Sequence, residues 1–426
     1  MDSIFQDESE LATVLRHLAL PPMFTTLRIN ELQSSKESIT DQLQEILKKQ
    51  YESKDMEPLP IVPHCCLRDA LYIKHRGPRL ELPQLQLKVV VGVACGMAVL
   101  RGADVFAQGI TGAPANLQAG EMVSVYADVD GGCRKGLTKP FEGTTIFVGN
   151  GRMLMSRRDI FVSMEKVSGM AIQMNQPLYE APSLSGILPS LVFPQNLPSV
   201  LCSHVLNPQP GQTIIDLCAA PGGKTVHLAS LMKNQGRVVA LDKTSGKISK
   251  VLSNAKEWGL SCIEAYAFDA SGSCCSTSDT EGPPPYPPLS FDHVLLDAPC
   301  SALGQRPSAA NSMRVREVSS YPVLQRKIFT EAVALLRDGG TLVFSTCTVT
   351  AEENEQQVAW ALRKFPQLTL VAQEPYLGGP GRPGQGLDEE QRRMVQRFDP
   401  GNIAFDQVDS DCIGFFIAKF IKNSIK

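Results

Sequence analysis

Residues 216–225 read Asp-Leu-Cys-Ala-Ala-Pro-Gly-Gly-Lys-Thr, between a segment with the pattern of a strand at 213–217 and one with the pattern of a helix at 224–232. Small residues and glycine at such a junction let the backbone turn tightly, which brings its N–H groups and the N-terminus of the helix against a bound ligand. The stretch therefore predicts a strand–turn–helix unit of an α/β sheet with a ligand-binding turn.

The residues that follow repeat this alternation. Strands are expected at 237–241, 263–268, 292–296 and 341–345, and helices at 246–258 and 323–336. Such alternation is typical of a parallel sheet built from βαβ units. Residues 271–290, rich in Ser, Thr, Gly and Pro, are expected to form a solvent-exposed insertion without a chemical role.

The chain before this sheet consists of two segments with different sequence patterns. Residues 1–84 combine helical spacing of leucines with a proline-rich, extended passage, and predict an N-terminal segment that packs on the α/β domain. Residues 85–178 carry short β-branched runs between glycine turns, which predict a small β-barrel-like module. Residues 179–426 hold the α/β domain. A chain of 426 residues exceeds what one hydrophobic core usually organises, in agreement with this division.

Charge and cysteine content limit the class of protein. The 41 basic and 44 acidic side chains give a net charge of −3, so any nucleic-acid surface must be local. The 12 cysteines show no CxxC or Cys/His ligand spacing, and His64-Cys65-Cys66 is too compressed for a zinc site, so we expect no metal and reduced thiols. An acidic start without a basic region before an apolar stretch indicates no secretory signal. The longest apolar run, 89–100, falls short of the roughly 20 residues of a membrane span, so a cytoplasmic protein is expected.

Acidic residues are expected at one edge of the sheet. Asp242 ends the strand after the turn, 20 residues beyond Gly222 (242 − 222 = 20), where a carboxylate can bind the ribose of a nucleoside cofactor. Asp269 and Asp297 close the next two strands, and Asp216 closes the first. One such aspartate alone is more often a helix cap or a turn former, and glycine turns with a distant acid also occur in NAD enzymes. The chain lacks the GxGxxG and GxxxxGK[ST] spacings, which weakens the NAD and nucleoside triphosphate interpretations.

Two cysteines follow neighbouring strands toward the same edge. Cys300 lies in Asp-Ala-Pro-Cys-Ser at 297–301 and Cys347 in Ser-Thr-Cys-Thr at 345–348. A thiolate suits attack on an electron-poor ring carbon when a cation or dipole keeps it ionised, and Lys224 at the start of a helix on that edge can help to do so. Cysteine is commonly a small buried hydrophobic residue without a chemical role, and we prefer this interpretation for three other cysteines: Cys202, Cys262 and Cys412.

These motifs, DLCAAPGGKT, LD, FD, LLDAPCS and STCT in that order, resemble the Nop/Sun RNA (cytosine-5) methyltransferases over residues 180–426. The module with VLRGADV at 99–105 and GNG at 149–151 resembles a PUA RNA-binding domain. A PUA module ahead of the catalytic domain, with HVLNPQPG and LGQRP around the motifs, is similar to the sixth branch of the family, which methylates the acceptor-stem cytosine of tRNA beside the 3′ CCA end. The resemblance implies a Rossmann-like class I methyltransferase sheet with an inserted PUA-type β-barrel and an N-terminal helical segment.

The resemblance also implies the roles of individual residues. S-adenosylmethionine would be the cofactor, held by Cys218, Ala219, Ala220, Pro221, Gly222, Gly223, Lys224, Asp242, Asp269 and Asp297. Cys347 would add to C6 of cytosine, so that C5 can accept the methyl group, while Asp297 and Lys224 hold the pyrimidine edge. Cys300 would assist elimination of Cys347, and the target base must leave its helix.

The same comparison suggests the RNA contacts. Arg134 and Lys135 match a basic pair that relatives place against tRNA, although a solvated hairpin turn is an equally good interpretation of position alone. Arg152, Arg157 and Arg158 are expected to add local positive charge. The partners expected are the acceptor stem and CCA end of tRNA, with mRNA as an alternative RNA, and no obligate protein partner is evident.

One departure from the family and three rival interpretations stay open at this point. The family's motif usually continues as Ser-Gly after the first cysteine, whereas Ala302 follows Ser301 here, and the added methyl group restricts the backbone. An RNA-binding pseudoenzyme would tolerate that change. A DNA cytosine-C5 methyltransferase would use Cys300 as the nucleophile, and an NAD-linked oxidoreductase would leave both cysteines unexplained.

Overall fold

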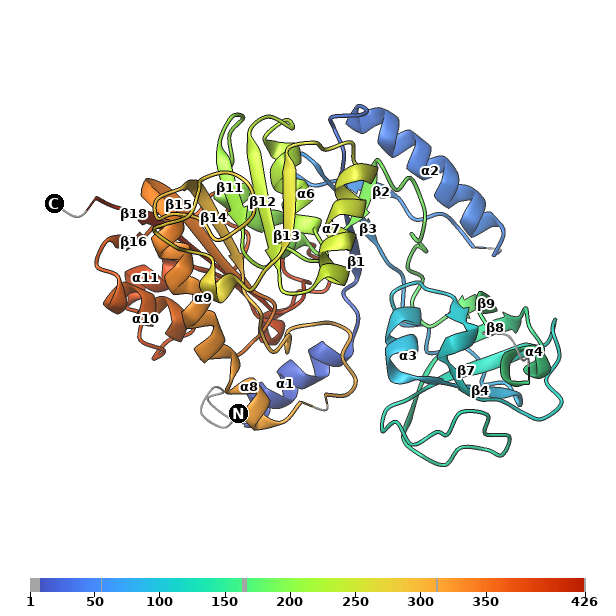
Figure 1. The fold of residues 1–426 in the computed structure, drawn as a ribbon. Coiled ribbons are helices and arrows are strands. Elements are labelled where there is room, and N and C mark those ends of the chain that lie inside the picture. The colour runs from blue at the N-terminus through green and yellow to red at the C-terminus, as the bar shows by residue number, and fades with distance from the viewer. Residues whose placement is uncertain (1–7, 55, 163–166, 312, 425–426) are drawn as a thin grey trace.

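The protein is described here from a computed structural model, which covers residues 8–54, 56–162, 167–311 and 313–424 (Figure 1). The first residues of the chain, which carried the expectation about a secretory signal, lie outside the described residues. Across the described ranges, no helix is both long enough and apolar enough to cross a membrane.

The C-terminal part is built on an eight-stranded sheet in the order β13-β12-β11-β14-β15-β18-β16, with β17 beside β18. Its strands are β11 (Thr213–Asp216), β12 (Arg237–Asp242), β13 (Ile263–Ala267), β14 (Phe291–Asp297), β15 (Leu336–Thr346), β16 (Leu368–Leu370), β17 (Gln396–Phe398) and β18 (Phe415–Lys422). The five from β11 to β15 pair in parallel, and β18 runs antiparallel to β15. The order changes direction between β11 and β14, and open α/β sheets bind their ligands at such a switch point.

Helices cover both faces of this sheet, which explains the nearly continuous apolar runs of its central strands. The helices and short 3₁₀ turns are α5 (Leu197–Leu206), α6 (Gly223–Leu231), α7 (Ser245–Glu257), η2 (Ala270–Gly272), α8 (Val315–Val318), α9 (Tyr321–Leu335), α10 (Glu355–Lys364), α11 (Glu389–Met394) and η3 (Pro400–Asn402). One core cluster joins the sheet to α9 and α10, and a second joins it to α5, α6 and α7. The predicted strands and helices of this part are confirmed to within a few residues, except that β15 begins at Leu336.

The segment 271–290 is less exposed than its composition suggests. Tyr286 is completely buried and packs edge-on against Phe291 at the start of β14, with ring centroids 5.2 Å apart. Ser273 is also buried and accepts the backbone N–H of Tyr286 through its carbonyl. The prediction of an exposed insertion is therefore wrong for these positions, because one aromatic ring anchors the polar segment to the core.

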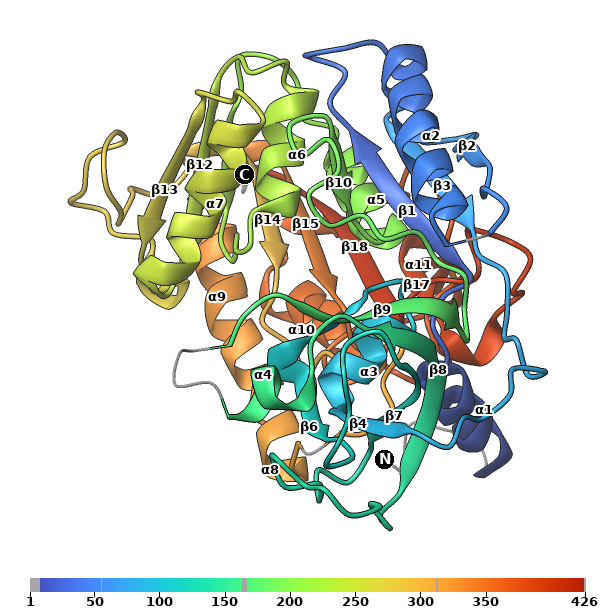
Figure 2. The ribbon, with the colours of Figure 1, turned by 90° about the vertical axis from the view of Figure 1, so that its right-hand side faces the viewer.

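The N-terminal part adds a second, smaller sheet in the order β10-β1-β3-β2. Its elements are α1 (Glu8–Ala19), β1 (Phe24–Ile29), α2 (Lys36–Glu52), β2 (Ile61–Pro63), β3 (Ala70–Lys74) and β10 (Val192–Pro194). Figure 2 shows β1 beside β10, a strand that comes more than 160 residues later and leads into α5 (194 − 29 = 165). The segment is thus joined to the α/β domain by strand pairing.

Buried polar contacts strengthen this attachment. The carboxylate of Asp69 accepts hydrogen bonds from Nε2 of His204 and Nε2 of His227, each at 2.7 Å. These three side chains lie close enough to hold a metal ion, but the N···O distances are those of hydrogen bonds. Arg28 stacks over the Trp258 ring at 4.2 Å and donates to the carbonyl of Gly223. The N-terminal segment therefore contacts the helix that starts at the predicted turn.

The middle module stands apart from both sheets (Figure 1). It contains a six-stranded sheet in the order β5-β9-β8-β7-β4-β6, in which β4 and β7 pair in parallel. Its elements are β4 (Lys88–Gly92), α3 (Val93–Val99), β5 (Val105–Phe106), η1 (Ala107–Gly109), β6 (Ile110–Gly112), β7 (Met122–Asp128), β8 (Thr145–Met153), α4 (Arg157–Phe161) and β9 (Met170–Pro177). A separate hydrophobic cluster forms its core, and the β-branched runs of this stretch lie in strands β4, β7 and β8.

Candidate active site

The turn after β11 has the tight geometry that its sequence predicts. Gly222 caps α6 with a φ of 105°, which L side chains rarely adopt. A Cβ added there would lie 3.0 Å from Cα of Val251 on α7. Glycine at this position is therefore required both by the backbone conformation and by the close approach of the neighbouring helix.

Four N–H groups of this turn, those of Cys218, Ala219, Ala220 and Gly222, donate to acceptors within the protein, so fewer amides are left to face a ligand than the sequence alone suggests. The amide of Ala219 donates to the carbonyl of Leu241, and the amide of Ala220 donates to the carboxylate of Asp242 at 3.2 Å. Asp242 also contacts Nζ of Lys247 at 3.1 Å. The acid at the end of β12 thus holds the turn in shape, and its predicted contact with the ribose of a cofactor stays a prediction.

Asp216, at the end of β11, is 1% exposed and lies beneath the turn. It accepts the hydroxyl of Thr225 at 2.7 Å and the amide of Cys218 at 3.4 Å. Burial raises the pKa of this carboxyl to about 7 against the opposing hydrogen bond from Thr225, and the nearby charge of Asp297 acts in the same direction as burial. Asp216 therefore binds a proton more tightly in the folded chain than in the unfolded chain.

Asp216→Asn is expected to change the pH dependence of stability. Because the folded-state pKa is raised above the roughly 3.9 of an unfolded aspartate, this group stabilises the fold most below about pH 4, and that contribution is lost as the pH rises through about 7. The free energy of unfolding of the variant should be lower by a constant amount, because its hydrogen bonds are weaker. Between pH 4 and 7 the parent loses stability that the variant keeps, so the difference between the two should shrink. Urea unfolding across this range measures the difference, and parallel stability curves would contradict the assignment.

Lys224 and Asp297 form an ion pair above the turn. Nζ of Lys224 lies 2.7 Å from Oδ2 of Asp297, whose other oxygen accepts the hydroxyl of Ser345 at 2.7 Å. Burial opposes the charge of Lys224, but the carboxylate of Asp297 outweighs it and raises the pKa of the lysine. The side chains at the ends of α6, β14 and β15 thus place a fixed positive charge at the predicted edge of the sheet.

Cys300 and Cys347 meet at this edge, with their Sγ atoms 3.5 Å apart. Hydrogen bonding from the thiol of Cys300 lowers the pKa of Cys347 against burial and the negative charge of Asp297, and Gln305 and Lys224 act in the same direction as Cys300. The same contact, together with burial, raises the pKa of Cys300 well above its usual value. The pair is therefore asymmetric: Cys347 is the sulfur that ionises more readily, and Cys300 is the one that keeps its proton.

Ala302 occupies a left-handed backbone conformation, with a φ of 55°. This explains why the resembled family has glycine after Ser301, since a Cβ is unfavourable in that region. We expect Ala302→Gly to raise the free energy of unfolding by about 1 kcal/mol, because relief of strain exceeds the added freedom of the unfolded chain. Urea unfolding would measure this. Ala310→Gly, which lies in the same loop without a positive φ, should be destabilising, and a stabilising effect of both would contradict the strain argument.

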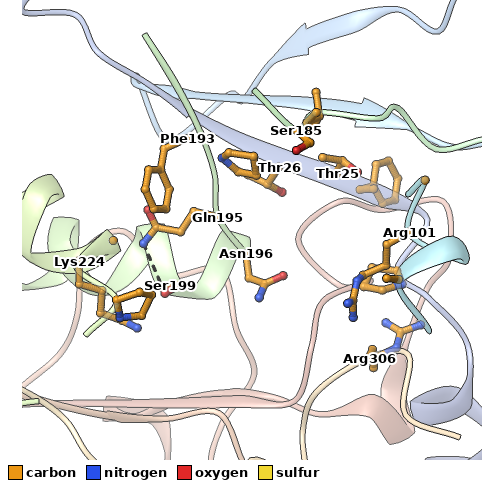
Figure 3. Close-up of a pocket in the computed structure, with 18 of the residues that line it drawn as sticks. Thr25, Thr26, Arg101, Ser185, Phe193, Gln195, Asn196, Ser199, Lys224 and Arg306 are labelled. Atoms are coloured by element: carbon orange, nitrogen blue, oxygen red, sulfur yellow. Dashed lines mark hydrogen bonds between the residues drawn. The ribbon is translucent and has the colours of Figure 1, made fainter. Parts of the chain in front are cut away.

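A cavity of about 540 Å³ opens beside the ion pair. Figure 3 shows Lys224 at one end, with Arg101 and Arg306 at the other, and Phe193, Gln195 and Asn196 between them. The predicted site residues that line it are Cys218, Ala219, Ala220, Pro221, Gly223, Lys224 and Asp297. The two cysteines lie outside its lining and are partly exposed.

Three predicted cofactor residues, Gly222, Asp242 and Asp269, also lie outside the cavity lining. Asp269 caps the turn η2 through the amide of Ser271 and contacts Lys243 at 3.3 Å. Hydrogen bonds from Ser271 lower its pKa. The capping role that is common for a single aspartate is thus observed for Asp269, and its contact with a cofactor stays a prediction.

Sequence reasoning missed the far wall of the cavity. Thr25, Thr26 and His75 come from the small sheet, and Arg101 follows α3 of the middle module. None of these belongs to a chemical motif, and only the tertiary arrangement brings them to Lys224. Arg101 and Arg306 lie at one end of this wall, where the charge of Arg306 is paired with the buried Asp411.

The basic residues predicted to form an RNA surface on the middle module are mostly exposed. Arg134 and Lys135 are exposed in the long connection between β7 and β8, and Arg152 and Arg158 are exposed as well. Arg157 differs, because its guanidinium donates to the carbonyls of Ala113 and Gly136, each at 2.6 Å. Its guanidinium therefore stabilises, through these hydrogen bonds, the turn that carries Arg134 and Lys135.

The three cysteines predicted to be small hydrophobic residues without a chemical role lie in or beside the core. Cys202 and Cys412 are buried, and Cys262 packs at the edge of the same hydrophobic core. Burial raises the pKa of Cys202 to about 12. Near the exposed pair Cys65 and Cys66, the Nε2 atom of His64 contacts Asp409 at 2.7 Å.

Comparison with known proteins gives matches over nearly the whole chain. The model of the family described as 16S rRNA methyltransferase RsmB/F matches residues 203–421. The tRNA (cytosine(72)-C(5))-methyltransferase NSUN6 of Homo sapiens is 48% identical over 434 residues, which cover 97% of this chain and 92% of that protein. The tRNA (cytosine(72)-C(5))-methyltransferase of Pyrococcus horikoshii is 30% identical and covers 97% of this chain and 93% of its own.

A solved structure agrees with these relatives. The crystal structure of NSun6 from Pyrococcus horikoshii with SFG has a TM-score of 0.79 and 28% identity, and the match covers 100% of this chain and 97% of that one. Together with the strand order, it confirms the α/β fold of class I S-adenosylmethionine-dependent methyltransferases. The chain therefore belongs to the Nop/Sun family of RNA (cytosine-5) methyltransferases, which includes the RsmB/F enzymes and NSUN6.

Proposed function

We propose that this protein transfers a methyl group from S-adenosylmethionine to C5 of a cytosine in tRNA, the acceptor-stem cytosine next to the 3′ CCA end. The observation that carries the proposal is the asymmetric pair of Cys300 and Cys347 beside the Lys224–Asp297 ion pair. The relatives named as tRNA (cytosine(72)-C(5))-methyltransferases support the choice of substrate.

The residues around the turn fit a nucleoside cofactor. The cavity reaches the turn residues from Cys218 to Pro221, and the carboxylate of Asp242 lies at the end of the adjacent strand. Asp269, at the end of the third strand, would complete this edge. When bound, S-adenosylmethionine supplies the electrophilic methyl group. The related structure with SFG, an analogue of that cofactor, supports the assignment.

In the proposed reaction, the thiolate of Cys347 forms a bond to C6 of cytosine, and the ring electrons shift so that C5 becomes nucleophilic. Lys224 and Asp297 would hold the N3 and amino edge of the base through their fixed charges. After methylation, loss of the C5 proton and cleavage of the S–C6 bond restore the aromatic ring. Cys300, whose sulfur lies 3.5 Å from that of Cys347, would assist this release.

The relatives named as tRNA (cytosine(72)-C(5))-methyltransferases favour the RNA mechanism over the DNA mechanism, and the direction of the two pKa shifts agrees with that choice. A DNA cytosine-C5 methyltransferase would attack through Cys300, whose pKa is raised by its contact with Cys347 and by burial. The lowered pKa of Cys347 favours the RNA mechanism instead. Retention of this asymmetric pair also argues against an inactive RNA-binding relative.

We further propose that residues 85–178 form a PUA-type RNA-binding domain. Residues 1–84 would then be the segment that packs on the methyltransferase domain, residues 179–426. The separate core of the middle module and its exposed Arg134 and Lys135 support this division. A cytoplasmic location fits the proposed tRNA substrate.

Bisulfite sequencing of unmodified tRNA after incubation with the protein and methyl donor tests the function directly. A cytosine that resists conversion beside the CCA end is the expected result. A protected cytosine elsewhere would overturn the proposed position, and complete conversion of every cytosine would overturn the proposed activity. A parallel incubation with unmodified mRNA transcripts tests the alternative RNA.

Replacing Arg134 and Lys135 together with glutamine is expected to weaken tRNA binding and to flatten its salt dependence. Each phosphate contact that is lost lowers the slope of log K against log salt by close to 1. Filter binding at several salt concentrations measures both quantities. An unchanged slope would contradict phosphate contact. Arg393→Gln, which removes a charge that is already paired on the surface, serves as the control.

A further inference from the structure

The loops that carry the two cysteines leave the pairing between β14 and β15 before either cysteine is reached. The ladder between these strands ends at Asp297 and Ser345. Cys300 and Cys347 lie three and two residues beyond these ends (300 − 297 = 3; 347 − 345 = 2), so the pairing of these two strands alone does not set the distance between their sulfur atoms. A backbone hydrogen bond, from the amide of Gly304 to the carbonyl of Cys347 at 3.0 Å, joins the loops, and side chains add the contacts on either side of Cys300.

Glu353 supplies such contacts from a position that is fully buried. Its Oε2 atom accepts the backbone N–H of Ser301 at 2.9 Å, and its Oε1 atom accepts the hydroxyl of the same serine at 2.6 Å. Oε1 also accepts the hydroxyl of Thr350 at 2.9 Å. The hydroxyls of Ser301 and Thr348 lie 2.7 Å apart. One carboxylate therefore binds both the residue after Cys300 and the loop that follows Cys347.

A third element joins the same carboxylate. Nε2 of the buried Gln325 on α9 donates to Oε2 of Glu353 at 3.1 Å and to the carbonyl of Pro299 at 3.0 Å. Pro299 and Ser301 flank Cys300 on either side. The backbone around this cysteine is thus fixed at two points, and both fixing contacts lead to Glu353.

We propose that Glu353 is a positioning residue, which fixes the loop of Cys300 against the loop of Cys347 so that the two thiols face each other. The proposal rests on the proposed function, since the paired thiols matter only if Cys347 attacks the base. A carboxylate suits the task because both of its oxygens accept and neither donates. An amide of the same shape would turn a donor toward groups that are themselves donors.

The residues next in sequence provide a contrast. Asn354 is equally buried, but its contacts in this region are with the hydroxyl of Thr346 and the carbonyl of Thr348, which both belong to the loop of Cys347. Glu355 is also completely buried, and its carboxylate binds Arg397 at 2.9 Å on β17. Of these three neighbours, Glu353 is the one whose contacts join the two cysteine loops.

A double-mutant cycle on the free protein tests this role. The rate of alkylation of Cys347 by iodoacetamide is measured against pH, with and without Cys300→Ala, in the parent, Glu353→Gln and Glu355→Gln. In the parent, loss of the Cys300 thiol should raise the apparent pKa of Cys347, because the hydrogen bond to its thiolate is lost. In Glu353→Gln that pKa should already be raised, and Cys300→Ala should change it little.

Glu355→Gln is the matched control, since it breaks a buried ion pair two residues away and lowers overall stability, while the carboxylate of Glu355 itself contacts Arg382 and Arg397 and not the loop of Cys300. It should retain the full effect of Cys300→Ala. Thr350→Val, which removes one donor to Glu353 with little change of shape, should reduce that effect partially and covers the case that Glu353→Gln does not fold. If Glu353→Gln folds and Cys300→Ala still raises the apparent pKa of Cys347 as much as in the parent, the proposal is overturned. If Glu353→Gln does not fold, the same result in Thr350→Val overturns it.

A second measurement uses RNA. Glu353→Gln should lower kcat for tRNA methylation by about 100-fold with KM nearly unchanged, because the reacting groups are displaced while the RNA surface is intact. A purely structural role would instead lower the active fraction in parallel with Tm, as expected for Glu355→Gln, and would overturn the proposal. If even the parent fails to methylate tRNA, the proposed function is wrong, and the thiol measurement still decides the role of Glu353.

Discussion

Cys347→Ala is expected to lower the rate of cytosine methylation by on the order of 10⁶-fold, the effect of removing a covalent nucleophile from an enzyme. The reason is that C5 of cytosine becomes a nucleophile only after a thiolate has added to C6. Cys347 is the sulfur whose pKa is lowered, and Lys224 and the thiol of Cys300 stabilise its anion. Transfer of a labelled methyl group to tRNA measures the loss, with Cys262→Ala as the control, a cysteine in the hydrophobic core.

The partner variant, Cys300→Ala, should behave differently and accumulate a covalent protein–RNA adduct. Addition through Cys347 still occurs in this variant, whereas the group proposed to assist release is missing. A shifted band that survives denaturing electrophoresis reports the adduct. If Cys347→Ala still methylates RNA, or if the adduct forms through Cys300, the two roles have been assigned in the wrong order.

The sheet and its ligand-binding turn could be predicted because both depend on local sequence. The alternation of strand and helix patterns from residue 213 onward predicts that the strands are parallel, and the carboxyl ends of parallel strands share one edge of the sheet. From this alone, Cys300 and Cys347 were expected to meet, and their Sγ atoms lie 3.5 Å apart. The strain at Ala302 also has a local origin, since the family's glycine points to a backbone that a Cβ disfavours.

The rest of the site depends on contacts between distant segments, for which the sequence carries no local signal. Glu353 reads as an ordinary helix-start residue, and its link to Ser301 appears only when two loops pack together. Arg157 is predicted only to add positive charge, whereas in the structure its guanidinium also donates to the carbonyl of Gly136 and stabilises that turn. Tyr286 is one aromatic residue in a polar segment, and burial of that ring outweighed the composition of its neighbours.

Arg306 shows how strongly such distant contacts matter for the cavity wall. Its guanidinium lies 2.6 Å from Asp411, and both side chains are completely buried. It also donates to the carbonyls of His17 and Leu20 around the end of α1, while Asp411 accepts the amide of Met23. One ion pair therefore joins the loop after Cys300, the N-terminal segment and the passage before β18.

Arg306→Ala is accordingly expected to lower the free energy of unfolding by about 3–5 kcal/mol, because it leaves the carboxylate of Asp411 buried without its partner. Urea unfolding measures the loss. Arg393→Ala is the comparison, since the pair of Arg393 with Glu389 is exposed and should contribute at most about 1 kcal/mol. A similar small loss for both variants would show that water reaches Asp411. Because Arg306 also lines the cavity that we assign to the nucleoside cofactor, the variant should weaken binding of S-adenosylmethionine even at temperatures where it stays folded, so stability and cofactor affinity are coupled through one side chain.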